Sequence, residues 1–211
     1  MLELFKKGNF VPINSDFMVE GHEVLQCVSK IQEKFNKEDT DTFINELRDS
    51  IAGYTLGFKL VNIEKHGFDC KLSENDEVYL EVKSASFSAK SWQATFNDTT
   101  LEKASSFKSK KVFLALAVWK NASDLLFICY GQNKKIGNFL EEKVKWFKEG
   151  HVVRSTQSIP LSSLVFDYNF KILAVNKTKE EVLNILRLKN RCFNKMPNDN
   201  VIELENFNGL D

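Results

Sequence analysis

Two acids and a lysine, Asp69, Glu81 and Lys83, lie in a segment whose residues alternate between apolar and polar types. Alternation with a period of two predicts β-strands, so Glu81 and Lys83 should share one strand face and Leu80 and Val82 the opposite face. Asp69 lies before a turn-like Ser-Glu-Asn-Asp stretch. Two antiparallel strands joined by that turn could bring Asp69 beside Glu81.

Such a cluster suits one kind of chemistry. Neighbouring carboxylates repel each other unless a positive charge lies between them. Mg²⁺ prefers oxygen ligands and accepts one or two carboxylates together with water and phosphate. The metal can polarise a phosphoryl oxygen and activate water, while the Lys83 ammonium can orient the attacking hydroxide and stabilise charge on phosphorus. The residues therefore predict phosphodiester hydrolysis, and the alternative is a solvated strand face with an ordinary ion pair.

The flanking segments predict the elements that would position these residues. Apolar spacing of three to four residues predicts helices, and short apolar or alternating runs predict strands. A capping box at Thr99 and Glu102 would begin one of the helices. The expected elements, in chain order, are helices over 24–35 and 43–53, strands over 58–64, 68–72 and 78–86, a helix over 99–107, strands over 112–119 and 125–131, a helix over 138–150, a strand over 170–175 and a helix over 178–190.

Helices and strands that follow each other along the chain predict an α/β fold, with a mixed central sheet flanked by helices. The length favours one domain over residues 1–211. Residues 40–131 would form its core, an N-terminal helix would precede that core, and the part after Gly131 is poorly constrained.

The pattern Phe68-Asp69, followed by Glu81-Val82-Lys83, resembles the PD-(D/E)xK nuclease superfamily, and type II restriction endonucleases in particular. Phe68 stands where the motif name has proline. The element order over residues 40–131 is similar to the common core of that superfamily. The resemblance implies a restriction-endonuclease-like core, Mg²⁺ held by Asp69, Glu81 and the Val82 carbonyl, and Lys83 as the catalytic lysine.

The same resemblance implies a sequence-specific endodeoxyribonuclease that cuts double-stranded DNA. It further implies a homodimer, because a palindromic site asks for two-fold symmetry, and a companion DNA methyltransferase in the same cell. Recognition and dimerisation elements would then lie in the C-terminal part. Two alternatives stay open: a repair or junction-resolving nuclease of the same superfamily, and a non-catalytic DNA-binding subunit of a restriction or antiphage complex.

Further polar residues near the motif have two interpretations each. Glu46 could be an accessory acid of the metal site, although a solvated helix face is favoured. Glu102 and Lys103 could approach the site from the next helix, where structural roles are favoured. The stretch 88–100 could contact DNA bases and phosphates or could be a loop packed on the core. Its DNA-binding candidates are Lys90, Trp92, Gln93, Thr95 and Asn97.

Composition limits the remaining classes. Basic and acidic residues both number 29, so the net charge gives no field to attract a polyanion, although lysines exceed acids over 81–111. The apolar runs are too short to span a bilayer, and the N-terminal residues lack a secretory apolar region, so a cytoplasmic location is expected. The scattered cysteines have no zinc-ligand spacing, and no phosphate-binding GxxxxGK[ST] loop is present.

Overall fold

The computed structural model describes residues 15–35, 42–60, 68–73, 77–151 and 155–210. Its elements in chain order are α1 (Ser15–Phe35), α2 (Thr42–Thr55), β1 (Lys59–Leu60), β2 (Cys70–Lys71), β3 (Tyr79–Ser86), β4 (Gln93–Phe96), α3 (Leu101–Ser106), β5 (Val112–Trp119), β6 (Leu125–Gly131), α4 (Lys134–Lys148), β7 (Gln157–Pro160), α5 (Leu161–Phe166), β8 (Lys171–Ala174), α6 (Lys179–Lys189), the 3₁₀ turns η1 (Arg191–Lys195) and η2 (Asn198–Asn200), β9 (Val201–Glu203) and η3 (Leu204–Asn206).

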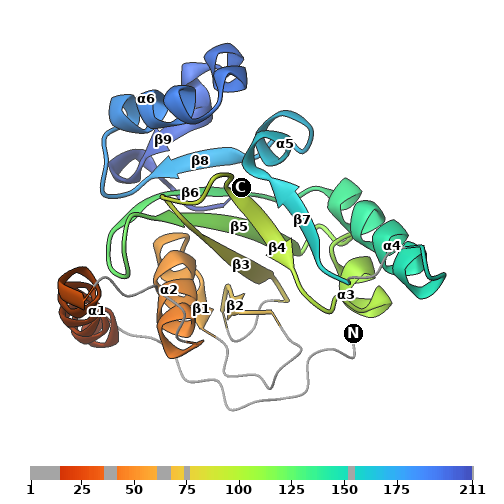
Figure 1. Cartoon of the computed structure of the whole chain (residues 1–211), viewed down its shortest axis with the longest axis horizontal. Coiled ribbons are helices and arrows are strands. Elements are labelled where there is room, and N and C mark those ends of the chain that lie inside the picture. The colour runs from red at the N-terminus through yellow and green to blue at the C-terminus, as the bar shows by residue number, and fades with distance from the viewer. Residues whose placement is uncertain (1–14, 36–41, 61–67, 74–76, 152–154, 211) are drawn as a thin grey trace.

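A mixed sheet of seven strands organises these elements, in the order β1-β2-β3-β5-β6-β8-β9 (Figure 1). β3 pairs in parallel with β5, and β8 with β9, whereas the other neighbours are antiparallel. Parallel neighbours need a crossover connection, and the connection from β3 to β5 contains α3. The predicted α/β fold, with a mixed central sheet flanked by helices, is confirmed at this level.

The two central strands of the sheet lie where the sequence placed them. β5 and β6 cover the predicted ranges 112–119 and 125–131. Apart from Phe113 and Gly131, all of their residues are buried. A continuous apolar run is typical of a strand that is covered on both faces. The ranges of β5 and β6 could therefore be predicted without knowing which strands pair with them.

The faces of β3 pack against different layers. Leu80 and Val82 belong to the same apolar cluster as Ala52 and Leu56 of α2. Tyr79 belongs to the larger cluster on the other face, which includes residues of α3, α4, α5, α6, β4 and β7. The predicted alternation along this strand is therefore confirmed, since Leu80 and Val82 share one face. Consequently, α2 approaches the candidate motif from one side of the sheet and α3 from the other (Figure 1).

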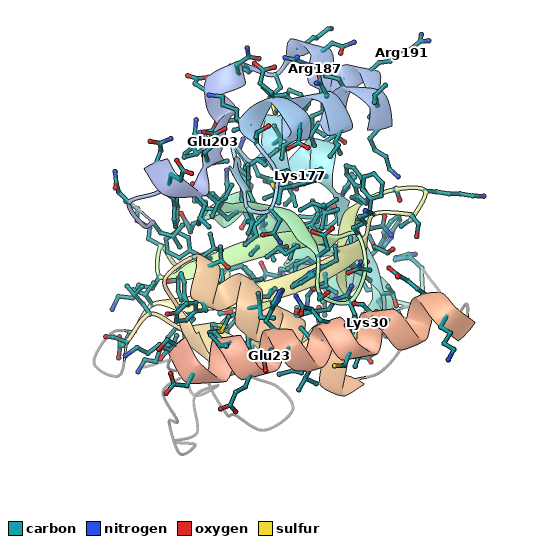
Figure 2. The ribbon with its side chains drawn as sticks, turned by 90° about the vertical axis from the view of Figure 1, so that its left-hand side faces the viewer. Glu23, Lys30, Lys177, Arg187, Arg191 and Glu203 are labelled. Atoms are coloured by element: carbon teal, nitrogen blue, oxygen red, sulfur yellow. The ribbon has the colours of Figure 1, made fainter. Side chains whose placement is uncertain are left out.

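The first helix and the C-terminal helical region lie on opposite sides of the molecule. Glu23 and Lys30 mark α1 at one side, whereas Arg187 of α6 and Arg191 of η1 lie at the far side of the sheet (Figure 2). None of the described helices combines the length and the apolar character that crossing a bilayer requires.

A second sheet, which the sequence analysis did not predict, pairs β4 with β7 in antiparallel register. Within β4 the side chains alternate, so that Ala94 and Phe96 are buried while Gln93 and Thr95 are half-buried. The two strands are more than sixty residues apart in the chain, with Thr95 paired to Ser158. Local spacing cannot reveal such a distant partner, which explains why this stretch could be interpreted as a loop.

The start of α3 corrects the predicted capping box. Thr100, and not Thr99, is the N-cap, and its hydroxyl accepts a hydrogen bond from the Lys103 backbone N–H at 3.1 Å. Glu102 is exposed in this register. Lys103 lies four residues before buried Phe107, a spacing that places both on the same face of the turn. Lys103 therefore lies on the face of α3 that is turned toward the sheet.

The region before the motif is described only in part. β1 covers two residues of the predicted strand over 58–64, and residues 61–67, including His66, lie outside the described part. β2 is likewise short and begins at Cys70, directly after Asp69.

Candidate active site

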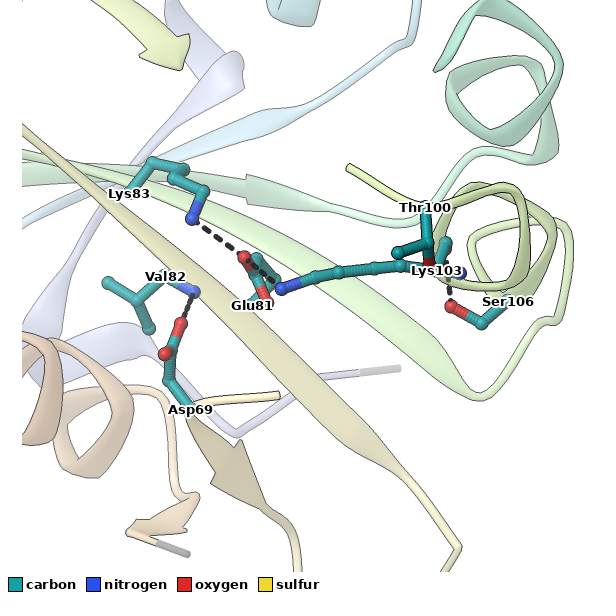
Figure 3. Close-up of polar contacts among 7 residues, drawn as sticks. All are labelled: Asp69, Glu81, Val82, Lys83, Thr100, Lys103 and Ser106. Atoms are coloured by element: carbon teal, nitrogen blue, oxygen red, sulfur yellow. Dashed lines mark hydrogen bonds and ion pairs between the residues drawn. The ribbon is translucent and has the colours of Figure 1, made fainter. Parts of the chain in front are cut away.

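Asp69 and Glu81 meet because β2 and β3 are antiparallel. The register pairs Cys70 with Leu80, so the next position along each strand is Asp69 on one side and Glu81 on the other. Asp69 lies in a bend just before β2, and its Oδ2 accepts a hydrogen bond from the Val82 backbone N–H at 2.7 Å (Figure 3). The proximity that alternation and the turn predicted is therefore present.

The Val82 amide is available to Asp69 because β2 ends too soon to pair with it. On this edge of β3, the ladder with β2 includes only Tyr79 and Leu80. The N–H and C=O groups of one residue in an extended strand point to the same side. The Val82 carbonyl therefore faces the same edge of β3 as its N–H, which Asp69 contacts.

Glu81 is buried at the centre of a charged cluster. Its side chain is 1% exposed, and its Oε1 lies 2.6 Å from Lys83 Nζ and 2.8 Å from Lys103 Nζ. Lys83 reaches it along β3 and Lys103 from α3, so the two ammonium groups approach from opposite sides (Figure 3). The alternative of a solvated strand face is wrong for Glu81, because burial has removed this carboxylate from water.

The second oxygen of Glu81 differs from the first. Oε2 is buried and accepts a hydrogen bond from no described residue. A buried acceptor left unpaired costs about 1–3 kcal/mol, more if it is charged. Oε2 is therefore a ligand atom that a cation could bind at little further desolvation cost.

The pKa values of the two carboxyls diverge. Burial, followed by the nearby charge of Glu81, raises the pKa of Asp69 to about 7, although Lys83 and the Val82 amide oppose the shift. For Glu81, burial alone would raise the pKa, but Lys83 and Lys103 outweigh it and the net pKa is lowered. Around neutral pH, Glu81 is therefore ionised whereas Asp69 lies near its midpoint.

Lys83 is held as a cation. Burial alone would lower its pKa, but the negative charges of Glu81, Asp69 and Asp49 outweigh that effect, and the pKa of Lys83 is raised. Its Nζ also lies 5.5 Å from the centroid of the Phe96 ring, a contact that favours a charged ammonium. In this arrangement Lys83 can donate hydrogen bonds and stabilise negative charge, but it cannot accept a proton.

Asp49 of α2 is a further acid of the cluster, which the sequence analysis missed. Its Oδ1 accepts a hydrogen bond from the Ser84 hydroxyl at 3.1 Å. Burial and the charge of Asp69 raise the pKa of Asp49 well above its usual value, while Lys83 lowers it. The helix that contains the accessory candidate Glu46, for which a solvated face was favoured, therefore places Asp49, three residues later, in the cluster. The side chain of Glu46 lies outside the described part of the structure.

A sequence signal for Asp49 does exist. Asp49 precedes Ala52, Gly53 and Leu56 by three, four and seven residues, and all three are buried. That spacing places the acid on a helix face of small and apolar residues. The apolar stripe from which this helix was predicted, between Phe43 and Ile51, lies on another face of the helix.

The donor set fits a metal that keeps part of its water shell. Within the described residues, no group of three His, Cys, Asp or Glu side chains is placed to hold a metal ion together. Two carboxylates are present, Asp69 and Glu81, together with the Val82 carbonyl and the unpaired Glu81 Oε2. Mg²⁺ is commonly bound by one or two carboxylates plus water and substrate phosphate, so this set suits it better than an ion that needs a full protein cage.

Trp92, one of the candidate DNA contacts, is a core residue. It is 3% exposed, its ring packs edge-on against Phe127, and its Nε1 donates a hydrogen bond to the Phe87 carbonyl at 3.2 Å. Lys189 Nζ lies 4.6 Å from the centroid of the same indole. Trp92 as placed is therefore not open to a nucleic-acid base.

The remaining candidates of this stretch lie at or near the surface. Lys90 and Asn97 are exposed, whereas Gln93 and Thr95 are half-buried. Thr95 forms a hydroxyl–hydroxyl hydrogen bond of 3.2 Å with Ser158 of β7. Asn97 Oδ1 accepts a hydrogen bond of 3.2 Å from the Thr156 hydroxyl, next to that strand. Lys90, the one basic residue of the stretch, is therefore accessible to solvent.

Compared with known proteins, the chain matches no family model, no curated protein and no solved structure. A functional assignment therefore depends on the arrangement of the chain's own residues.

Proposed function

We propose that the protein is a Mg²⁺-dependent endodeoxyribonuclease, a type II restriction enzyme that hydrolyses phosphodiester bonds in double-stranded DNA. The observation that carries the proposal is the buried Glu81, which has one oxygen bound to Lys83 and Lys103 and the other without a partner in the described chain, beside an Asp69 of raised pKa. A stabilising ion pair alone gives no reason for an unpaired oxygen and a second, destabilised carboxyl.

In this proposal Asp69, Glu81 and the Val82 carbonyl would hold the metal. A Mg²⁺ ion bound there would polarise a phosphoryl oxygen and lower the pKa of a bound water. Asp69 is anchored by the Val82 amide, so its second oxygen can turn to the metal while the hydrogen bond stays in place. Asp49 would contribute negative charge from the opposite side through Ser84.

Lys83 would act on the substrate as a fixed positive charge. Because its pKa is raised by the surrounding acids, its proposed role is to orient the attacking water and stabilise charge on the phosphorus. A role as general base is less suited to a lysine held in the protonated form.

The finer features of the proposal come from the resemblance of the motif. They are the sequence-specific site, the homodimer, the companion methyltransferase and the restriction-endonuclease-like core. A dimer would place one catalytic cluster on each strand of a palindromic duplex.

The test is cleavage of phage DNA by the purified chain at low salt, with Mg²⁺ in one reaction and EDTA in the other. Discrete bands that need Mg²⁺ are expected. Lys83→Ala should abolish them, and Lys111→Ala is the matched control, because Lys111 pairs with exposed Glu77. Equal cleavage by the Lys83 variant would remove the site assignment.

A non-catalytic DNA-binding subunit is the second candidate. It is favoured by one observation, that both lysines near Glu81 are already engaged in ion pairs. Intact DNA in both reactions, together with retention of duplex DNA on the folded protein, would select this candidate.

Asp49→Asn should weaken the proposed metal site without removing a ligand. The amide can still accept the Ser84 hydrogen bond, but it lacks the negative charge that acts on Lys83. Loss of a group that supports metal ligands typically costs about 10–100-fold in affinity. Titration of the DNA-free protein with Mn²⁺, followed by electron paramagnetic resonance of the free ion, measures the change. Unchanged affinity would mean that Asp49 plays no part in the site.

A further inference from the structure

The Glu81 carboxylate is paired with two ammonium groups, one more than a single ion pair requires. Its Oε1 is shared by two ammonium groups, at 2.6 Å from Lys83 and 2.8 Å from Lys103. Each ammonium group is attracted to the carboxylate, but the two ammonium groups repel each other because they carry like charges. This repulsion reduces the stabilisation that the second ion pair adds. One of the two lysines therefore has to be explained by something other than neutralising Glu81.

The two lysines belong to different elements. Lys83 lies two residues from Glu81 on the same strand face, and the charge of Asp49 acts on it, whereas the charge of Asp69 interacts with both lysines. Lys103 crosses from α3 to β3 with a long side chain, and its Nζ passes 5.7 Å from the centroid of the Phe68 ring. The two side chains are similarly exposed, Lys83 at 24% and Lys103 at 21%. The difference between them is one of place, because Lys103 lies on α3 and can turn away from Glu81 without a change in the strand that carries the carboxylate.

A divalent cation at the free oxygen of Glu81 would meet both ammonium groups. Oε2 belongs to the same carboxyl as the oxygen that binds them. Coulomb repulsion over such short distances is large even at the effective dielectric constant of a protein surface. Departure of one lysine relieves this repulsion. We identify Lys103, because its Nζ lies at the longer distance from Oε1 and because it lies outside the strand that carries Glu81.

We propose that Lys103 is a positioning residue that competes with the divalent cation for Glu81. In the metal-free protein Lys103 neutralises the buried carboxylate, and it leaves Glu81 when the metal binds. This inference rests on the proposed metal-dependent function, because it needs a metal at Glu81. It adds a residue that the sequence motif does not contain.

Metal binding by the DNA-free protein tests the proposal without any need for cleavage. The probe is Mn²⁺ alone, with the free ion measured by electron paramagnetic resonance. Lys103→Gln should bind Mn²⁺ about tenfold more tightly than the wild type, because one competing charge is gone. Lys103→Arg, which keeps the charge, should bind Mn²⁺ as the wild type does.

The control is Lys111→Gln. Lys111 also pairs with a glutamate, Glu77, at 3.1 Å, but this pair lies on the surface away from Glu81. Its substitution removes the same charge from the chain and should leave Mn²⁺ affinity unchanged. A comparable gain in this variant would overturn the proposal, since the effect would then belong to net charge.

The remaining outcomes separate the two proposals. If the wild type binds Mn²⁺ and Lys103→Gln binds it equally or less tightly, Lys103 only braces Glu81 and this inference is wrong, while the proposed function stands. If the wild type and Lys103→Gln both fail to bind Mn²⁺, the competition and the metal-dependent function fail together. Thermal unfolding of each variant in EDTA shows whether it is folded. If Lys103→Gln is unfolded, the Mn²⁺ affinity of Lys103→Arg is the test, and an affinity different from that of the wild type would contradict the proposal.

Discussion

Asp69→Asn should abolish Mg²⁺-dependent DNA cleavage and, in the same protein, raise the thermal stability of the metal-free form above neutral pH. The amide oxygen can still accept the Val82 N–H hydrogen bond, so local geometry is kept. What disappears is the negative charge that the proposed site needs for a metal. A loss of activity of at least about a thousandfold is expected, since a catalytic metal supplies several kcal/mol.

The gain in stability follows from the raised pKa of Asp69. Its pKa is about 7 in the folded protein, against about 3.9 in an unfolded chain. The folded state therefore holds the proton more tightly, and its stability falls as pH rises from about 4 through 7. Asparagine avoids this penalty. In EDTA, the melting temperature of Asp69→Asn should exceed that of the wild type at pH 8, and the gap should close near pH 4.

Together the two measurements separate a functional carboxyl from a structural one. A variant that is inactive but more stable identifies a group retained at a cost in folding. A variant that is inactive and less stable at pH 8 would show that Asp69 contributes to folding, and its raised pKa would then be wrong. Full activity in Asp69→Asn would remove this residue from the metal site.

Part of this site could be derived from the sequence, because it depends on local rules. Alternation along 78–86 and a turn before it were enough to place Glu81 and Lys83 on one face and Asp69 beside them. Period and turn chemistry act over a few residues, and antiparallel pairing across a short connection leaves little freedom of register.

The parts of the site that the sequence analysis missed or disfavoured depend on how separate layers meet. Lys103 reaches Glu81 from α3 across the layer between that helix and β3, and the N-cap of α3 is Thr100, one residue later than predicted. Asp49 reaches Ser84 because α2 packs its small-residue face on β3. The partner of β4 lies in β7, far along the chain. Each depends on tertiary packing, which local spacing does not specify.

Glu81→Gln should behave in the opposite way to Asp69→Asn and destabilise the protein strongly. Glutamine keeps the shape of the side chain but leaves Lys83 and Lys103, each less than a quarter exposed, without their shared counter-charge. Removing one member of a buried ion pair typically costs 3–5 kcal/mol, and the residual exposure of the lysines places this case near about 3 kcal/mol. Urea unfolding at pH 7.5 in EDTA measures the loss.

The pH dependence has the opposite sign as well. Burial alone would raise the pKa of Glu81, but the two lysines lower it below its usual value. The stability that this carboxylate contributes is therefore present above the unfolded-state pKa of about 4.3 and is lost as pH falls through the lower folded value. The difference between wild type and Glu81→Gln should persist from pH 6 to 8 and shrink in acid.

A second substitution identifies the source of the loss. In Glu81→Gln with Lys103→Gln, one of the two uncompensated cations is gone, so part of the stability should return, and a double-mutant cycle gives the coupling between the two residues. If Glu81→Gln is as stable as the wild type at pH 7.5, the ion pairs contribute nothing to folding. If instead the loss occurs but the double variant recovers nothing, Lys83 alone accounts for the ion-pair energy, and the contact between Lys103 and Glu81 is energetically neutral in the metal-free protein.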